Sequence, residues 1–255
     1  MKILCVTQAR VGSTRFYGKI LKKINSKTLL EIHLKRISKS KFIDKIIVAT
    51  SVNPDDKKIH KICKNLSYNF FAGSENDVLD RIYKASLKYK EYKYIVRLTS
   101  DCPLIDPILI DKVIKYCLAN KLDYCSNTLN PTYPDGQDIE IFTLNALKKA
   151  WKNAKMPSER EHVTPYIWKN STYNKKNMFK SENFDEGFDY SNIRMTVDEL
   201  NDYILVKKIV ENLNYESGWL DYVFFILNNP ELKNINKFIN RNEGYTKSLN
   251  NEKDR

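Results

Sequence analysis

Glycine is scarce in this chain, with 7 residues in 255. Two of them lie in the segment 7–21, TQARVGSTRFYGKIL, which follows the first apolar run. Neither GxGxxG nor GxxxxGK[ST] occurs there, so a dinucleotide fingerprint and a Walker-type phosphate loop are both unsupported. The segment nevertheless carries the cations Arg10, Arg15 and Lys19. Such a loop after a strand is typical of phosphate binding, and on spacing alone a basic surface turn is an equal alternative.

The five cysteines include no CxxC pair, and their number is odd. This argues against a zinc site and a disulfide framework, and predicts reduced, mostly buried thiols. Long apolar runs are also missing. The most apolar later stretch, 219–227, contains Asp221 and is far shorter than the roughly 20 residues that a membrane span needs. The run before Gln8 is too short for a signal peptide, so we expect a cytoplasmic protein with no membrane partner.

Acidic residues are outnumbered, with 31 Asp and Glu against 43 Lys and Arg and a formal net charge of +12. The lysines are spread along the chain among many asparagines instead of being gathered in one arm. This spread favours solvated surfaces over a nucleic-acid-binding face, and we expect no nucleic-acid partner. A small polyanionic ligand is compatible with the same charge.

The first half of the chain alternates apolar, β-rich runs with helical patterns. Short connections between them predict an α/β fold with a mostly parallel central sheet and helices on both faces. The expected strands are 2–7, 46–50, 68–72 and 94–98, and the expected helices are 29–37, 54–66, 75–89 and 107–119.

The second half is less regular. We expect one domain over residues 1–227 with a small inserted excursion after Leu122, and a polar, partly mobile C-terminal extension over 228–255. The expected strands are 123–126, 139–143 and 194–197, and the expected helices are 144–154, 158–168 and 200–213.

Two aspartates follow predicted strands. Asp101 comes directly after the fourth strand, at the edge where open α/β sheets bind ligands, whereas Asp106 is expected to cap the helix that begins at Pro107. Asp198 also ends a short apolar run, and on local sequence alone it is better explained as a helix N-cap. Together with the cationic loop, Asp101 and Asp198 make a plausible site for a metal-bound triphosphate.

The opening segment resembles the signature of the cytidylyltransferases that make CMP-activated acidic sugars, most closely the spore-coat polysaccharide type. The resemblance covers about residues 1–215 and continues, in order, through five further motifs: GSENDVLDRIYKA (73–85), LTSDCPLIDP (98–107), PDGQDIEIFT (134–143), EREHVTPYIW (159–168) and RMTVDELND (194–202).

The resemblance implies a Rossmann-like nucleotidyltransferase fold, a homodimer, and a Mg²⁺-dependent reaction of CTP with an acidic sugar or a phosphorylated acceptor that releases pyrophosphate. It assigns catalysis to Arg10, Arg15, Lys19 and Asp101, and Mg²⁺ to Asp101 and Asp198. The implied nucleotide-binding residues are Gln8, Ala9, Arg10, Ser13, Arg15, Lys19, Gly73, Ser74, Asn76, Asp77 and Ser100. The residues implied to face the acceptor are Asp135, Gln137, Asp138, Glu140 and His162.

Two positions depart from the family pattern. Phe16 and Tyr17 stand where the family usually has Leu-Pro, which removes a fixed φ from the loop, and Ser100 stands where it usually has glycine. A nucleotide-sugar-dependent glycosyltransferase is the main alternative, but the DxD motif it needs is missing after Asp101. A nucleic-acid-binding module is a third alternative, based on net charge alone. Two histidines on predicted helices, His33 and His60, are expected at surface or groove positions.

Overall fold

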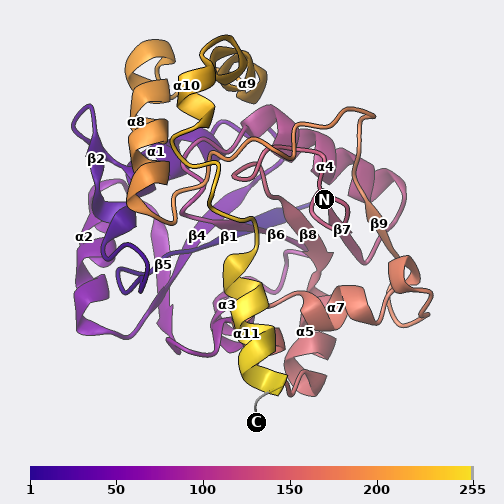
Figure 1. The fold of residues 1–255 in the computed structure, drawn as a ribbon. Coiled ribbons are helices and arrows are strands. Elements are labelled where there is room, and N and C mark those ends of the chain that lie inside the picture. Colours follow the sequence, from indigo (N-terminus) through magenta and orange to yellow (C-terminus); the bar gives the residue numbers. More distant parts are fainter. Residues whose placement is uncertain (254–255) are drawn as a thin grey trace.

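The computed structural model describes residues 1–253 and contains a seven-stranded sheet (Figure 1). The strand order is β5-β4-β1-β6-β8-β7-β9, and only β8 runs antiparallel to its neighbours. The predicted α/β class and mostly parallel sheet are therefore confirmed. The strands are β1 (Ile3–Gln8), β4 (Lys45–Ser51), β5 (Asn69–Gly73), β6 (Tyr94–Thr99), β7 (Tyr124–Ser126), β8 (Glu140–Thr143) and β9 (Ser181–Asn183).

Strand β1 is central because it pairs in parallel with both β4 and β6. Its last residue, Gln8, is opposite Ala49 on one side and Thr99 on the other. Ser100 N also donates to Gln8 O at 3.1 Å. The loops that follow β1 and β6 therefore leave the same edge of the sheet side by side, which brings the cationic segment next to Asp101.

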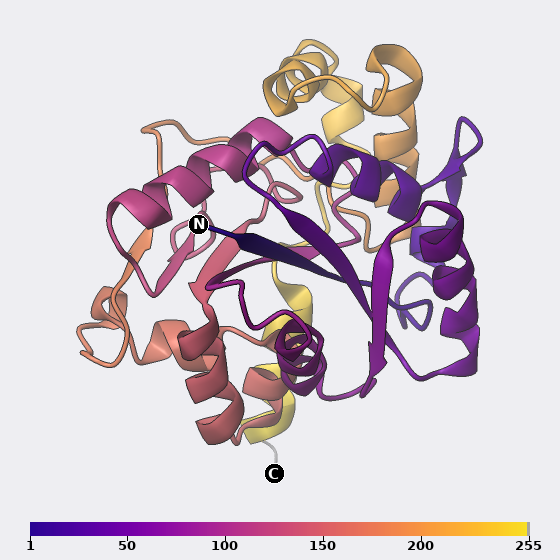
Figure 2. The same cartoon turned by 180° about the vertical axis from the view of Figure 1, so that it is seen from behind.

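Alternate side chains of β1 enter two different cores, as the period of a strand requires. Ile3 and Cys5 pack in the core that contains α1, α4, α8 and α9, whereas Leu4 and Val6 pack in the core that contains α3 and α5. Helices thus cover both faces, as Figures 1 and 2 show. These helices are α1 (Leu29–Ile37), α3 (Val78–Leu87), α4 (Pro107–Ala119), α5 (Leu144–Asn153), α8 (Leu200–Leu213) and α9 (Trp219–Asn228).

The smaller elements connect this framework. A 3-10 turn and an antiparallel hairpin follow the loop after β1, and a second 3-10 turn leads into α2. These elements are η1 (Lys19–Leu21), β2 (Lys23–Ile24), β3 (Lys27–Thr28), η2 (Pro54–Asp56) and α2 (Lys57–Asn65). A third 3-10 turn, η3 (Thr172–Asn174), precedes β9.

The second half differs from expectation in three places. The helix predicted over 158–168 is two helices, α6 (Pro157–His162) and α7 (Pro165–Lys169), because Val163 has a φ of 75°. The strand predicted over 194–197 is reduced to a single bridge between Asp135 and Arg194. Strand β9 was not predicted, and together with β7 and β8 it makes the expected excursion part of the main sheet.

The C-terminal segment contains two further helices, α10 (Pro230–Lys233) and α11 (Glu243–Lys253). Leu232 packs in the same core as α8 and α9, beyond the predicted domain boundary at residue 227. Helix α11 then crosses to the half of the molecule that holds α3, α5 and α7 (Figure 1) and packs against α6. The mobility expected for this segment stays a prediction.

The sulfur and histidine expectations have different outcomes. All five cysteines are free and buried, as predicted. His33, however, is fully buried, so the expected surface or groove position is wrong. Both of its ring nitrogens have partners inside the protein, with Thr7 Oγ1 2.8 Å from Nε2 and Cys102 O 2.9 Å from Nδ1. Burial lowers its pKa to about 4. Within residues 1–253, no helix combines the length and the apolar character needed to cross a membrane.

Candidate active site

A cavity of about 1030 Å³ opens at the edge of the sheet where β1 and β6 end. All but two of the residues that the sequence assigned to the site line it; the exceptions are Gly73 and Gln137. The predicted residues in the lining are Gln8, Ala9, Arg10, Ser13, Arg15, Lys19, Ser74, Asn76, Asp77, Ser100, Asp101, Asp135, Asp138, Glu140, His162 and Asp198.

The loop after β1 is fixed by a buried carboxylate that the sequence analysis missed. Asp56 is 1% exposed, and its Oδ1 accepts a hydrogen bond of 2.7 Å from Val11 N. Its other oxygen accepts from the Thr50 and Ser51 side chains and from Ser51 N. Gly18 closes the loop with a φ of 66°, a left-handed conformation that favours glycine. The path of the loop is therefore determined before any ligand binds.

Lys19 joins the two aspartates that the sequence placed at strand ends. Its Nζ lies 2.8 Å from Asp101 Oδ2 and 2.8 Å from Asp198 Oδ1. Burial opposes the charge of Lys19, but the two carboxylates raise its pKa above the usual value. Three charged groups from distant parts of the chain thus meet at one point.

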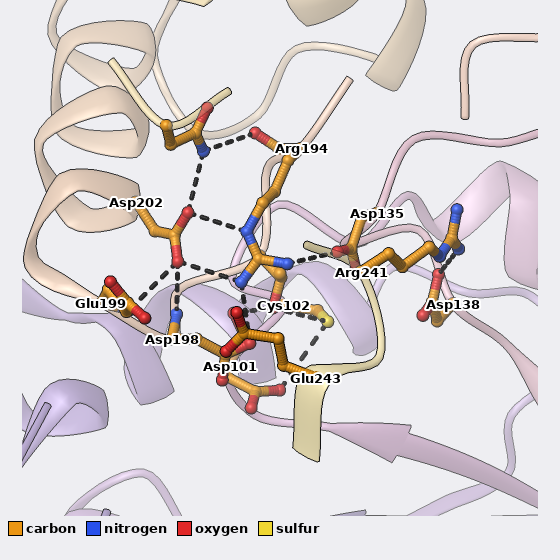
Figure 3. A network of polar contacts seen from close by, with 12 residues as sticks. Asp101, Cys102, Asp135, Asp138, Arg194, Asp198, Glu199, Asp202, Arg241 and Glu243 are labelled. Carbon is orange, nitrogen blue, oxygen red and sulfur yellow. Dashed lines mark hydrogen bonds and ion pairs between the residues drawn. The ribbon is translucent and has the colours of Figure 1, made fainter. Parts of the chain in front are cut away.

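Arg194 contacts the other carboxylate oxygen of Asp198 and belongs to the polar network of Figure 3. Its Nη2 is 2.8 Å from Asp198 Oδ2, its Nε is 2.9 Å from Asp202 Oδ1, and its Nη1 pairs with Asp135. Asp202 Oδ2 accepts from the backbone N–H groups of Asp198 and Glu199 at the start of α8. The interpretation of Asp198 as a helix cap is therefore wrong, because Glu199 occupies the cap position and the Asp198 side chain is used in ion pairs.

Asp198 is ionised because cations surround it. Arg15 Nη2 lies 2.7 Å from its Oδ1, beside Lys19. Burial alone would favour the neutral acid, but Lys19, Arg15 and Arg194 hold the pKa of Asp198 well below its usual value. Arg10 lines the same side of the cavity and makes no ion pair with any residue in 1–253.

The donor set fits a magnesium ion. Asp101 and Asp198 each direct one oxygen at a single point, where the Lys19 ammonium supplies positive charge. Mg²⁺ typically takes one or two protein carboxylates and completes its shell with water and substrate phosphates. No group of three or more Asp, Glu, His or Cys side chains suited to a metal occurs within residues 1–253. Two aspartates alone would therefore leave most of the coordination shell of a metal ion to water and substrate.

The side of the cavity expected to hold the base and ribose contains a second residue that was missed. Arg81 is 2% exposed, its Nη1 donates to Ser74 O at 2.7 Å, and its buried Nε has no hydrogen-bond partner among residues 1–253. Gly73 lies behind it, since a Cβ there would be 3.1 Å from Arg81 Cγ and 2.9 Å from Phe71 Cε1. Gly73 therefore makes room for the arginine and does not face the cavity itself.

On the side expected to hold the acceptor, each arginine has a carboxylate partner. Arg97 pairs with Glu140 and also donates to Gln8 Oε1 at 2.9 Å. Glu140 Oε1 accepts a hydrogen bond of 2.7 Å from the Tyr124 hydroxyl. Two other residues implied to face the acceptor are paired in the same way, Asp135 with Arg194 and Asp138 with Arg241. Arg160 pairs with Asp77, which was implied to bind the nucleotide.

Gln137 has a structural position instead. It is fully buried, its Oε1 accepts from Asp106 N at 2.9 Å, and its Nε2 donates to Leu104 O at 2.9 Å. It fixes the loop after Asp101 and lies outside the cavity lining. His162 does line the cavity, and its Nε2 lies 3.1 Å from Ser248 Oγ on α11.

Comparison with known proteins finds relatives that cover most of this chain. An uncharacterized protein of Methanocaldococcus jannaschii is 43% identical over 241 residues, which cover 92% of this chain and 95% of that protein. The spore coat polysaccharide biosynthesis protein SpsF of Bacillus subtilis is 31% identical over 223 residues, covering 82% and 86%.

Solved structures agree with the sequence relatives. A cytidylyltransferase of Leptospira borgpetersenii superposes with a TM-score of 0.85 and 36% identity, covering 91% of this chain and 96% of that one. The family profile described as cytidylyltransferase matches residues 4–223, a segment that includes Asp101, Asp198 and the three cations that contact Asp198, which are Arg15, Lys19 and Arg194. The chain therefore belongs to the cytidylyltransferase family and is a CTP-dependent nucleotidyltransferase.

Proposed function

We propose that this enzyme transfers CMP from CTP to an acidic sugar with the help of Mg²⁺, and that the product serves the synthesis of a surface polysaccharide or glycoconjugate. The observation that carries the proposal is the meeting of Asp101, Asp198 and Lys19 at 2.8 Å within one large cavity. The Bacillus relative is a spore coat polysaccharide biosynthesis protein, which supports the proposed pathway.

In this proposal an acceptor oxygen attacks the α-phosphorus of CTP, the bond from that phosphorus to the bridging oxygen breaks, and pyrophosphate leaves. Arg10 and Arg15 bind the triphosphate, because guanidinium groups form paired hydrogen bonds to phosphate oxygens. Lys19 stabilises the charge that moves onto the leaving pyrophosphate. Positioning and charge neutralisation supply most of the rate in phosphoryl-transfer reactions of this kind.

Asp101 and Asp198 would hold the Mg²⁺ ion. When bound, the ion would neutralise phosphate charge and lower the pKa of an oxygen nucleophile. The ion pairs of the site support this role. Lys19 and Arg15 both contact Asp198 Oδ1, so a triphosphate that recruits these cations leaves this carboxylate oxygen open to another positive charge.

The test is pyrophosphate release from each of the four nucleoside triphosphates with Mg²⁺, against a panel of acidic sugars, neutral sugars and sugar phosphates. We expect release with CTP and an acidic sugar only, and loss of release when EDTA removes the metal. Turnover with neutral sugars alone would contradict the acceptor class, and full activity in EDTA would contradict the metal.

The homodimer and the cytoplasmic location also stay proposals. A soluble homodimer predicts an elution volume in size-exclusion chromatography that corresponds to twice the chain mass, independent of salt. Elution at the monomer mass with full activity would contradict the dimer. The same column run with added oligonucleotides tests the expectation of no nucleic-acid partner.

A further inference from the structure

The C-terminal helix α11 lies outside the segment that matches the family, which ends at residue 223. It nevertheless forms part of the wall of the active-site cavity. Its lining residues are Glu243, Gly244, Tyr245, Lys247, Ser248 and Asn251.

We propose that α11 is the acceptor-side wall of this active site, and that Lys247 on this helix receives the carboxylate of the acceptor. The proposal rests on the acidic acceptor of the proposed function and names the residue that selects it.

Polar contacts place the helix over the acceptor side. Ser248 Oγ lies 3.1 Å from His162 Nε2 and donates to Glu161 Oε2 at 2.8 Å. Glu252 accepts from Ser158 Oγ at 3.0 Å and also from Ser158 N, at the start of α6. These contacts fix α11 next to His162, one of the residues that the sequence assigned to the acceptor.

No residue of α11 is buried, so the helix is held without an apolar core of its own. Tyr245 contacts His162 and Trp168 ring to ring, with centroids 5.0 and 6.4 Å apart. The chain enters α11 through Asn242, which has a φ of 59°, after Arg241 has been fixed by Asp138. Helix α11 is therefore held near both of its ends, by Arg241 before it and by Glu252 in its last turn, and its side chains stay at least partly exposed.

Arg10 makes no ion pair within residues 1–253 but is assigned to the triphosphate, and Arg81 lies on the side expected to hold the base, so charge pairing among the remaining cations points to Lys247 for the acceptor. Arg97, Arg160 and Arg241 are each committed to a carboxylate of the protein, so a ligand carboxylate would have to displace that partner. Lys247 has a weaker and more exposed contact, 3.5 Å from Glu243 Oε2 on the same helix. Exposed i,i+4 pairs contribute little to stability, and exchanging this one for a ligand carboxylate costs correspondingly little.

The neighbouring groups suit the rest of such a ligand. Ser248 and Asn251 also line the cavity. The Ser248 hydroxyl already donates to Glu161, whereas the Asn251 amide has both a donor and an acceptor for sugar hydroxyls. Glu243 lies at the other end of the helix, 3.8 Å from Arg15 Nη1. The helix thus runs from the proposed triphosphate side to the acceptor side.

The experiment measures steady-state kinetics of the full chain and of Lys247→Gln, with CTP, Mg²⁺ and the acidic sugars of the panel. Lys253→Gln is the matched control, because Lys253 is an exposed lysine of the same helix that does not line the cavity. We expect Lys247→Gln to raise KM for the acidic sugar about tenfold, the order expected for one charge-assisted hydrogen bond. KM for CTP and the melting temperature stay at their wild-type values, as do all parameters of the control.

The carboxamide of the same sugar separates a charge effect from a general defect. If Lys247 receives the carboxylate, the wild-type enzyme prefers the acid over the amide, and Lys247→Gln loses that preference. An unchanged acid-to-amide ratio in the variant would overturn the proposal for α11 while leaving the proposed function intact. A wild-type enzyme that turns over neutral sugars but no acidic sugar would instead overturn the proposed function, and with it this role of Lys247.

Discussion

Arg194 Nη2 lies 2.8 Å from Asp198 Oδ2, whereas Lys19 and Arg15 contact the other oxygen, Oδ1. The two oxygens of one carboxylate are therefore used differently. Arg194 fixes the orientation of Asp198 from behind, and Oδ1 is directed into the cavity where the cations gather. Asp202 completes this arrangement, because it binds both Arg194 and the backbone of Asp198.

The role of Arg194 is tested by Arg194→Lys. A lysine ammonium cannot contact Asp135, Asp198 and Asp202 at once, so we expect the free energy of unfolding to fall by about 3 kcal/mol. The expected loss in kcat is about tenfold, because Asp198 is no longer oriented. Urea unfolding and steady-state kinetics measure the two effects. The exposed α8 residue Lys207 supplies the control, Lys207→Arg, and a variant at 194 with wild-type kcat would show that Asp198 needs no such support.

Lys19→Ala removes the cation between two carboxylates. If Lys19 meets charge on the leaving pyrophosphate, kcat falls by about 100-fold with a smaller effect on CTP affinity. The variant also leaves Asp101 and Asp198 without their shared ammonium, so added Mg²⁺ should raise its melting temperature more than that of the wild type. A Lys19→Ala enzyme with nearly wild-type kcat would remove Lys19 from the chemistry.

Arg10→Ala should instead weaken both CTP binding and turnover.

Asp101 and Asp106 lie five residues apart but have different roles. Asp106 accepts hydrogen bonds from Ile108 N and Leu109 N at the start of α4, whereas Asp101 pairs with Lys19 in the cavity. Asp101→Asn should keep the melting temperature and lose kcat by orders of magnitude, since an amide holds Mg²⁺ poorly. Asp106→Asn should lower the melting temperature and keep kcat. More than about a tenth of wild-type kcat in Asp101→Asn, a loss of only about 1.4 kcal/mol, contradicts the metal role.

The cationic loop predicts a preference for triphosphates. Because Arg15 and Lys19 are gathered at one point, CTP with Mg²⁺ should raise the melting temperature more than CMP with Mg²⁺ at equal concentration. Differential scanning fluorimetry with both nucleotides measures this difference. Equal shifts would show that the β- and γ-phosphates do not contact the loop.

His33 makes stability depend on pH. Its pKa is lowered by burial to about 4 in the folded protein, against about 6.5 in the unfolded chain. The unfolded state therefore binds more protons between these values, and the free energy of unfolding falls by about 3 kcal/mol as the pH drops from 7 to 4. His33→Gln, which cannot titrate, should flatten this part of the profile. An unchanged slope in urea melts at pH 4, 5, 6 and 7 would assign the pH dependence to other groups.

Elements whose signals are local could be predicted from the amino-acid sequence. Proline and capping residues mark the starts of η2 and α4, where Asn53 and Asp106 accept backbone hydrogen bonds as expected. Alternation of strands and helices predicted the parallel part of the sheet, because each of those elements is encoded by the periodicity of its own residues. The cationic loop with Lys19 and the position of Asp101 could also be predicted, because each directly follows a predicted strand.

Contacts between distant side chains, in contrast, could not be predicted from local patterns. Lys19 and Asp198 are 179 residues apart, and no local pattern reports a contact that depends on strand order. For the same reason the local sequence around Asp198 taken alone favoured a helix cap, the family resemblance implied an acceptor contact for Gln137, and His33 was expected at a surface or groove position. Arg81 and Asp56 were missed because their roles depend on burial in the folded chain. Helix α11 was missed because its role depends on where it packs relative to the cavity. Periodicity within one element determines which of its faces is buried, but the partners on that face come from the packing of the whole chain.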